Sequence, residues 1–164
     1  MNFGKPIYVA QGIYQLRAIG ARVSVILGNE GAALVDTGGP GSFGAIASGL
    51  KSLGLPLEVV RWILLTHYHP DHSGSLWRLA QATGAKVAMH KMEWPLLSGE
   101  RPTPSPFRNP LVAGLTTPRG RRMYDIPPKA DLLLEDGDEL PLDSQSKLQV
   151  VHTPGHTPGS ISLY

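Results

Sequence analysis

The sequence has 164 residues, of which 41% are hydrophobic and 17% are charged, and its formal net charge is +2. These values are typical of a globular domain that buries a core, and they exclude a disordered chain. The charge is too small to indicate a nucleic-acid partner by itself, and the lack of cysteine excludes disulfides and thiolate metal ligands. With no secretory signal and no apolar run near the ~20 residues that span a bilayer, we expect a soluble, cytoplasmic domain without membrane contact.

The first third of the chain consists of short β-rich segments and one helical segment. The turn at residues 28–31 is typical of a hairpin. Apolar residues follow helical spacing from Phe43 to Leu53, and Gly54 suits the end of that helix. Strands are predicted at residues 7–9, 13–16, 21–27 and 32–35.

The middle of the chain has a strand–helix–strand order. Residues 59–65 form an apolar run that predicts a buried strand. A short helix is expected from Leu76 to about Gly84, and another strand at residues 86–89. This order predicts an α/β layered domain, and short strands return from residue 132 onward. We expect one domain over residues 1–164.

Residues 98–130 show no regular pattern and contain seven prolines. Six basic residues stand against two acidic ones in this segment. A long irregular segment in a compact domain is usually a functional lid or a mobile loop, and we expect a variable substrate loop here. Its positive charge suits an anionic substrate or a phosphate backbone, and a solvated loop without a ligand is the alternative.

The residues that follow the predicted buried strand carry the strongest chemical signal. His67, His69, Asp71 and His72 fall within six positions. Because residues two apart face the same way in an extended segment, His67 and His69 can direct two imidazoles at one ion. Pro70 favours a turn that brings Asp71 and His72 round from another direction. Nitrogen and oxygen ligands of this kind suit one or two Zn²⁺ ions, with iron or manganese as alternatives.

The alternative for any one of these histidines is a capping or surface role. A single histidine after a buried strand more often has such a role than a ligand role. Four such side chains packed together without a metal would compete for protons and would need separate hydrogen-bond partners. The whole array therefore favours a metal site.

Three motifs together resemble those of the metallo-β-lactamase superfamily. The array followed by Ser73 and Gly74 resembles the first metal motif, and residues 151–160 resemble the next one. Residues 34–38 resemble the early acidic motif of the same superfamily. The resemblance extends over residues 34–160 in the expected order, and it implies an αββα sandwich with one or two metal ions at the edge between two central sheets.

The resemblance also implies a role for each matched residue. Asp36 would support the metal loop from behind the ligands, and an Asx-turn role ahead of two glycines is the alternative. The implied ligands are His67, His69 and His156 for the first ion, and Asp71 and His72 for the second.

A site of this kind implies a zinc-dependent hydrolase. A zinc-bound water loses a proton near pH 7, so hydroxide is available to attack an ester, a thioester, a lactone or a β-lactam-like amide in a small molecule. We expect Asp71 to orient this nucleophile as a catalytic group. One alternative is a metal-binding but inactive fragment or interaction module. Another is a nuclease that processes RNA or another phosphodiester, although the large RNA-docking insertion of tRNA-processing members is absent from the sequence.

The chain departs from the superfamily after the third motif. Complete members continue with a second half that brings a bridging aspartate and a final histidine. No acidic residue follows Asp143 and no histidine follows His156 in this sequence. We therefore expect an N-terminal portion of the fold, which belongs to a longer protein, self-associates, or binds a complementary chain that replaces the missing half.

The remaining candidate residues are expected to be structural. His152 precedes a tight Thr-Pro-Gly turn, and His90 lies at the end of a predicted strand outside every motif. The tryptophans are expected to be buried or half-buried packing residues.

Overall fold

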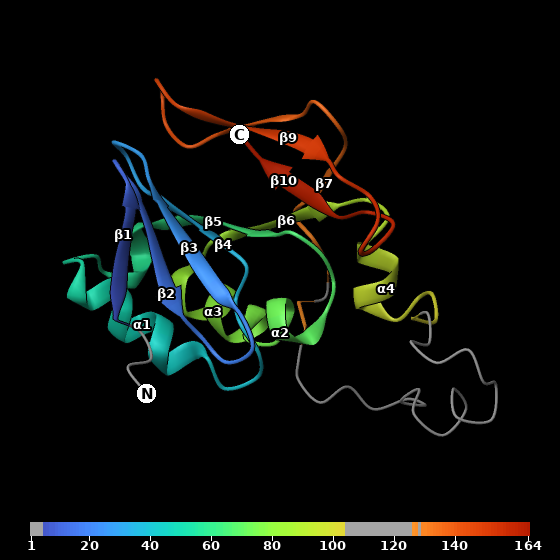
Figure 1. The fold of residues 1–164 in the computed structure, drawn as a ribbon, viewed down its shortest axis with the longest axis horizontal. Helices are drawn as coiled ribbons and strands as arrows, with labels where there is room; N and C mark the ends of the chain where they lie inside the picture. Colours follow the sequence, from blue (N-terminus) through green and yellow to red (C-terminus); the bar gives the residue numbers. More distant parts are fainter. Residues whose placement is uncertain (1–4, 104–125, 128) are drawn as a thin grey trace.

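The computed structural model describes residues 5–103, 126–127 and 129–164 (Figure 1). Most of the irregular segment at residues 98–130 lies outside the described residues, so its role as a substrate loop stays a prediction. In the described part no helix is both long and apolar enough to cross a membrane. The cytoplasmic location also stays a prediction.

The first four strands form an antiparallel series. They are β1 (Pro6–Ala10), β2 (Ile13–Arg17), β3 (Arg22–Leu27) and β4 (Ala32–Val35). Alternate residues of β3 point into the core, with Val23 and Val25 fully buried. The hairpin predicted between β3 and β4 is confirmed, and the amide of Gly28 donates to the carbonyl of Gly31 at 2.8 Å.

Three parallel strands complete this sheet on the far side of β4. They are β5 (Val60–Leu65), β6 (Lys86–His90) and β7 (Leu132–Leu134), and the seven strands lie in sequence order. Their connections carry helices α1 (Phe43–Ser52) and α3 (Leu76–Thr83), which cover one face of the sheet (Figure 1). Gly84 ends α3 in the left-handed conformation that glycine adopts without strain.

A second, three-stranded antiparallel sheet covers the other face. It consists of β8 (Glu139–Pro141), β9 (Lys147–His152) and β10 (Ile161–Leu163), with β9 in the middle. Leu140, Val150 and Ile161 of this sheet pack with Leu64 and Leu134 of the first sheet in one buried cluster. The larger buried cluster lies between the first sheet and its helices. The described layers are therefore helix, sheet and sheet, which are three of the four layers of the expected αββα sandwich.

A polar contact also joins the two sheets at the turn between β8 and β9. The carboxylate of Asp143 accepts hydrogen bonds from the backbone amides of Gln145, Asn29 and Ser146. These bonds favour the charged form, so they lower the pKa of Asp143 to about 2. The bond from Asn29 fastens the β3–β4 turn to the second sheet.

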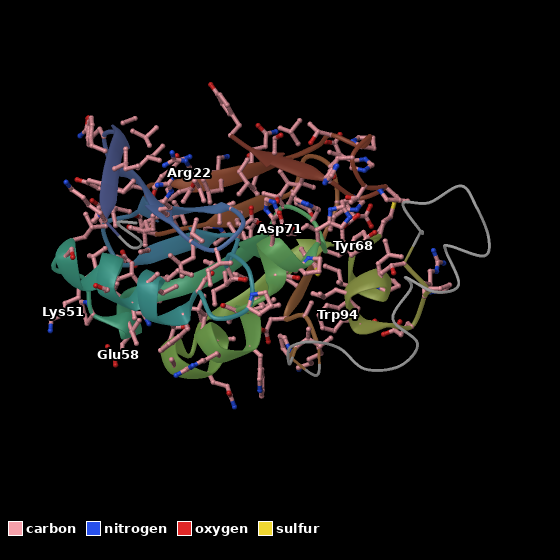
Figure 2. The ribbon with its side chains drawn as sticks, turned by 60° about the horizontal axis from the view of Figure 1, so that its bottom comes forward. Arg22, Lys51, Glu58, Tyr68, Asp71 and Trp94 are labelled. Atoms are coloured by element: carbon pink, nitrogen blue, oxygen red, sulfur yellow. The ribbon has the colours of Figure 1, made fainter. Side chains whose placement is uncertain are left out.

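Three short helices were not predicted from the sequence. They are the 3₁₀ turn η1 (Leu57–Val59), α2 (Pro70–Ser73) and α4 (Trp94–Ser98). Helices of one turn are too short to show the apolar periodicity on which such predictions depend. The predicted packing of the tryptophans is confirmed, because Trp94, labelled in Figure 2, is buried and Trp62 and Trp77 are partly buried.

The glycine at position 74 allows α2 to pack against the turn after β4. A Cβ atom at Gly74 would overlap the ring of Pro40 and the carbonyl oxygen of Pro70. We expect Gly74→Ala to lower the free energy of unfolding by about 1–3 kcal/mol, because the tight contact would be overpacked. Urea denaturation measures this change.

The same substitution at Gly44 is a matched control, because a Cβ atom there meets nothing within 4 Å in helix α1. Gly44→Ala should leave the stability unchanged or raise it by up to about 1 kcal/mol. Equal effects of the two substitutions would contradict the close approach at Gly74.

Candidate metal centre

The candidate site begins where β5 ends. The backbone leaves the sheet after Leu65 and turns at His69, whose carbonyl accepts hydrogen bonds from the amides of His72 at 2.9 Å and Ser73 at 3.0 Å. Pro70 is the first residue of α2, where its missing N–H and fixed φ suit a helix start. The proline was predicted to cause a turn, and this turn is helical.

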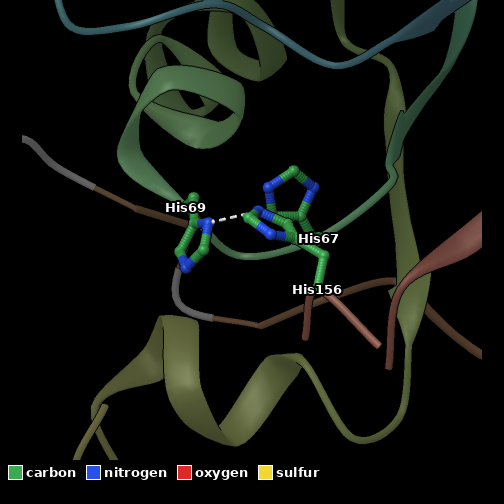
Figure 3. A group of neighbouring side chains, drawn as sticks. All are labelled: His67, His69 and His156. Atoms are coloured by element: carbon green, nitrogen blue, oxygen red, sulfur yellow. Dashed lines mark hydrogen bonds between the residues drawn. The ribbon is translucent and has the colours of Figure 1, made fainter. Parts of the chain in front are cut away.

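Three histidines from two distant segments meet at this point. His67 and His69 come from the loop after β5, and His156 comes from the loop between β9 and β10 (Figure 3). One nitrogen atom from each of the three rings lies within 4.8 Å of the others. His69 Nδ1 and His156 Nε2 are 2.9 Å apart. Nitrogen ligands of a tetrahedral zinc ion lie about 3.3 Å apart, so small ring movements would complete such a set.

His67 contains a buried nitrogen to which no described residue forms a hydrogen bond. His67 is only 6% exposed, and its Nε2 has no hydrogen-bond partner in the described part of the chain. The rings of His69 and His156 lie 4.8 Å from the His67 ring, and the His72 ring lies 4.1 Å away. An unpaired buried polar atom costs stability, and a metal ion among these rings would supply the missing partner.

The surroundings of His67 and His69 favour the neutral forms of these two rings. Burial and the neighbouring imidazoles of His72, His69 and His156 together lower the pKa of His67 to about 4. Burial and the neighbouring His156 also lower the pKa of His69. A neutral imidazole has the free lone pair that a metal ion needs, so these rings are ready to bind metal without losing a proton.

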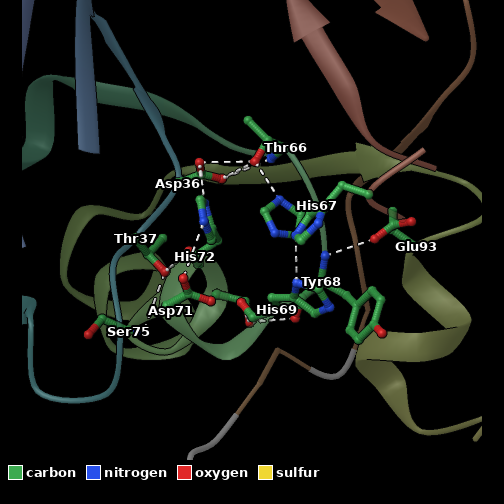
Figure 4. A network of polar contacts seen from close by, with 12 residues as sticks. Asp36, Thr37, Thr66, His67, Tyr68, His69, Asp71, His72, Ser75 and Glu93 are labelled. Atoms are coloured by element: carbon green, nitrogen blue, oxygen red, sulfur yellow. Dashed lines mark hydrogen bonds and ion pairs between the residues drawn. The ribbon is translucent and has the colours of Figure 1, made fainter. Parts of the chain in front are cut away.

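Asp36 lies behind the histidines, as Figure 4 shows. It ends β4 with a left-handed φ of 66°, a conformation that few residues other than glycine, asparagine and aspartate adopt. Its carboxylate accepts hydrogen bonds from the amide of Thr66 at 2.9 Å and from its hydroxyl at 3.0 Å. A further bond of 2.8 Å joins Asp36 Oδ2 to His72 Nδ1.

These contacts determine which nitrogen of two imidazoles carries the proton. His72 donates from Nδ1 to the Asp36 carboxylate, which raises the pKa of His72 and leaves Nε2 free of a proton while the ring is neutral. The Thr66 hydroxyl uses its proton on Asp36, so at 3.0 Å it accepts from Nδ1 of His67. His67 Nε2 is then also unprotonated. Asp36 thus sets the tautomer of one ring directly and of another through Thr66.

Asp71 and His72 lie beside the three-histidine group. Asp71 Oδ2 is 3.5 Å from His72 Nε2, and the Asp71 side chain is half exposed. The pair offers one oxygen and one nitrogen atom next to His67. Neither Asp71 nor His72 belongs to the group of three potential ligands found among the described residues. The structure therefore places all five sequence-predicted ligands in one region.

His90 and His152, the two histidines expected to be structural, stack on each other. Their rings stack at 4.3 Å with an interplanar angle of 10°. His90 is 3% exposed, and its Nδ1 accepts from the amide of Met92 at 3.3 Å. His152 Nε2 is 2.9 Å from the carbonyl oxygen of Pro158.

Glu93 is a residue of this region that the sequence did not indicate. Its side chain is fully buried, and its carboxylate accepts hydrogen bonds from the amides of Tyr68 and Gly159. The available signal was a lone acidic residue between Met92 and Trp94, just after a strand. That signal does not reveal which backbone groups the carboxylate meets.

Sequence comparison finds a matching family model and several relatives of this chain. The family model described as the metallo-beta-lactamase superfamily matches residues 17–164. The probable metallo-hydrolase YflN of Bacillus subtilis (strain 168) is 34% identical over 134 residues, which cover 80% of this chain and 50% of that protein. A hydroxyacylglutathione hydrolase of Albidiferax ferrireducens is 44% identical over 61 residues, or 35% of this chain and 23% of that protein.

Solved structures show the same fold. The subclass B3 metallo-beta-lactamase BJP-1 of Bradyrhizobium japonicum has a TM-score of 0.78 and 27% identity, with 97% of this chain and 55% of that chain covered. The class B3 di-zinc metallo-beta-lactamase LRA-12 from an Alaskan soil metagenome has a TM-score of 0.79 and 26% identity, with 97% and 56% covered. The chain thus spans about half the length of the relatives that it matches.

The low pKa of His67 predicts how the stability of the metal-free chain depends on pH. Between the ordinary pKa of 6.5 and the folded value of about 4, the unfolded chain binds a proton that the folded chain does not. The free energy of unfolding should therefore fall as the pH falls through this window, by up to about 3 kcal/mol from His67. His72 acts in the opposite sense, but its contribution is already complete below its unfolded pKa.

Urea denaturation at several pH values, with a chelator present, measures this dependence. The variant His67→Gln should show a shallower loss of stability below pH 6.5 than the wild-type chain does. Parallel curves for the two proteins would show that His67 is not buried in its neutral form.

Proposed function

Because this chain belongs to the metallo-β-lactamase superfamily, we propose that it carries the metal-binding part of a zinc-dependent hydrolase. His67, His69 and His156 hold the first zinc ion in this proposal. The observation that carries it is the convergence of three imidazoles around the buried, unpartnered Nε2 of His67. Zinc is the metal of choice because three neutral nitrogen ligands with an open fourth position suit it well.

Asp71 and His72 supply the ligands for a second ion in the proposal. Their oxygen and nitrogen atoms lie 3.5 Å apart, next to His67. Asp36 holds His72 by its Nδ1–H, and so Nε2 stays available. Iron or manganese could replace zinc at such a mixed oxygen and nitrogen site.

The chain's own groups would orient and bind the reactants. When bound, zinc supplies a water of lowered pKa and polarises the carbonyl group of the substrate. Asp71, with its side chain half exposed, accepts a hydrogen bond from the attacking water and so fixes its direction. The buried carboxylate of Asp36 keeps the histidine rings in place throughout, because three hydrogen bonds and its own backbone hold it.

The substrate class in this proposal is a small carboxylic ester, thioester or lactone, or a β-lactam-like amide. The names of the relatives support hydrolysis at an acyl carbon, since they include hydroxyacylglutathione hydrolase and metallo-beta-lactamases. The chain spans about half the length of these relatives. A second copy or a complementary chain is the proposed source of further groups for the second ion.

Metal stoichiometry and a hydrolysis panel test the proposal together. Purified protein, stripped and reloaded with zinc, should bind at least one ion by native mass spectrometry. The double variant His67→Ala/His69→Ala should bind none at the same concentration, because two of the three nitrogen ligands are lost. His152→Gln is the matched control, since its amide can still donate to the carbonyl of Pro158.

Turnover of ester, thioester, lactone and β-lactam substrates separates the candidate functions. Zinc-dependent hydrolysis of one of these, abolished in the double variant, supports the hydrolase. One bound ion without turnover of any substrate favours a metal-binding module, and cleavage of RNA alone favours the nuclease. A protein that binds no transition metal would contradict all three.

A further inference from the structure

Glu93 is a buried acidic residue that the proposed chemistry does not use. It precedes α4, and its side chain has no solvent exposure. A carboxylate is costly to bury unless hydrogen bonds compensate for the lost water, so its partners indicate what it does. Both of its oxygen atoms have partners on segments that carry proposed metal ligands.

Each oxygen atom binds a different one of these segments. Oε2 accepts from the amide of Tyr68 at 2.8 Å, and Tyr68 stands between His67 and His69 (Figure 4). Oε1 accepts from the amide of Gly159 at 2.7 Å, three residues after His156. The two amides lie 25 and 66 residues away from Glu93 in the sequence, so a single carboxylate joins segments that are distant in the chain.

Hydrogen bonds within residues 153–160 hold together the segment that carries His156. The amide of Thr153 donates to the carbonyl of Ser160 at 2.8 Å, and the amide of Thr157 donates to the Ser160 hydroxyl at 3.1 Å. The Thr157 and Ser160 hydroxyls are a further 2.7 Å pair. Residues 153–160 therefore behave as one unit, and the position of His156 follows from where this unit is attached.

Besides the contact between the His69 and His156 rings, two backbone amides at the end of this unit donate hydrogen bonds on the side of His67 in the described part of the chain. One is the bond from Gly159 to Glu93, and the other runs from the amide of Ile161 to the carbonyl of Thr66 at 3.1 Å. The second bond joins the first residue of β10 to the residue that follows β5. Of these two amide bonds, the one from Gly159 is accepted by a side chain, and it lies nearer to His156 in the sequence.

The contact at Gly159 leaves no room for a side chain. A Cβ atom there would lie 2.7 Å from Nδ1 of His90, 2.8 Å from Cγ of Glu93 and 2.9 Å from its Oε1. Glycine thus allows the backbone of this segment to rest directly on Glu93.

We propose that Glu93 is a positioning residue that clasps the His156 segment to the His67–His69 segment and so sets the spacing of the three imidazoles before metal binds. The proposal rests on the zinc site proposed above. It predicts that Glu93 acts on zinc affinity through His156, without touching the metal.

The variant Glu93→Gln tests the clasp with little change of volume. The amide oxygen can accept from one backbone N–H, but the NH₂ group faces the other N–H, so one of the two bonds is lost. We expect the zinc affinity, measured by competition with a chromophoric chelator, to fall about 10- to 100-fold. In the metal-free protein, hydrogen exchange at Tyr68 or Gly159 should become about tenfold faster or more.

A double-mutant cycle distinguishes positioning from a general loss of structure. In a His156→Ala background, where the third imidazole is already missing, Glu93→Gln should change the zinc affinity by less than about threefold. Glu135→Gln removes an exposed carboxylate that pairs with Lys91 and controls for the change in charge. Gly159→Ala perturbs the same contact from the other side and should weaken zinc binding in the way that Glu93→Gln does.

The outcomes are distinguishable from those for the proposed function. Wild-type affinity in Glu93→Gln, or an equal loss in both backgrounds, would overturn the clasp and leave the zinc site standing. A wild-type protein that binds no zinc would overturn the zinc site and the clasp together. Weakened binding that depends on His156, with Glu135→Gln unaffected, is the result that the proposal requires.

Discussion

The carboxylate of Asp36 accepts hydrogen bonds from Thr66 and His72, and the protonation pattern of the candidate metal centre depends on these bonds. They place a proton on the Nδ1 atom of His72 directly and on that of His67 through the Thr66 hydroxyl. Each ring then directs an unprotonated Nε2 away from Asp36. Because Asp36 sits at the end of β4 in a left-handed conformation, the sheet itself fixes where this carboxylate points.

This arrangement costs the metal-free protein stability, because it buries imidazole nitrogen atoms with few hydrogen-bond partners. Four rings lie within one region, and burial lowers the pKa values of His67 and His69 so that neither gains stabilisation from a proton. A divalent cation would give His67 Nε2 a partner and would replace the hydrogen bond between the His69 and His156 rings. The geometry that destabilises the metal-free protein would thus favour metal binding. Because a metal ion that binds the folded chain also stabilises it, metal affinity and the free energy of unfolding are linked.

Much of this structure could be predicted from local sequence, because the strands, the helices α1 and α3 and the β3–β4 hairpin have clear apolar patterns or turn residues. The ligand roles of His67 and His69 could be inferred from spacing, whereas that of His156 depended on a resemblance between motifs. The 87 residues that separate His69 from His156 carry no local signal that the rings would meet. Glu93 was missed because its partners are backbone amides, which any sequence provides, and only the folded chain brings them to it.

The nitrogen atoms proposed to bind the first zinc ion can be observed one by one. Long-range ¹H–¹⁵N NMR spectra of protein labelled at histidine report the protonation and metal binding of each ring nitrogen. On addition of one equivalent of zinc, we predict coordination shifts at His67 Nε2, His69 Nδ1 and His156 Nε2 together, with His67 and His72 protonated at Nδ1. Shifts at His90 and His152 in their place, or no shift at any histidine, would contradict a zinc site built from these three rings.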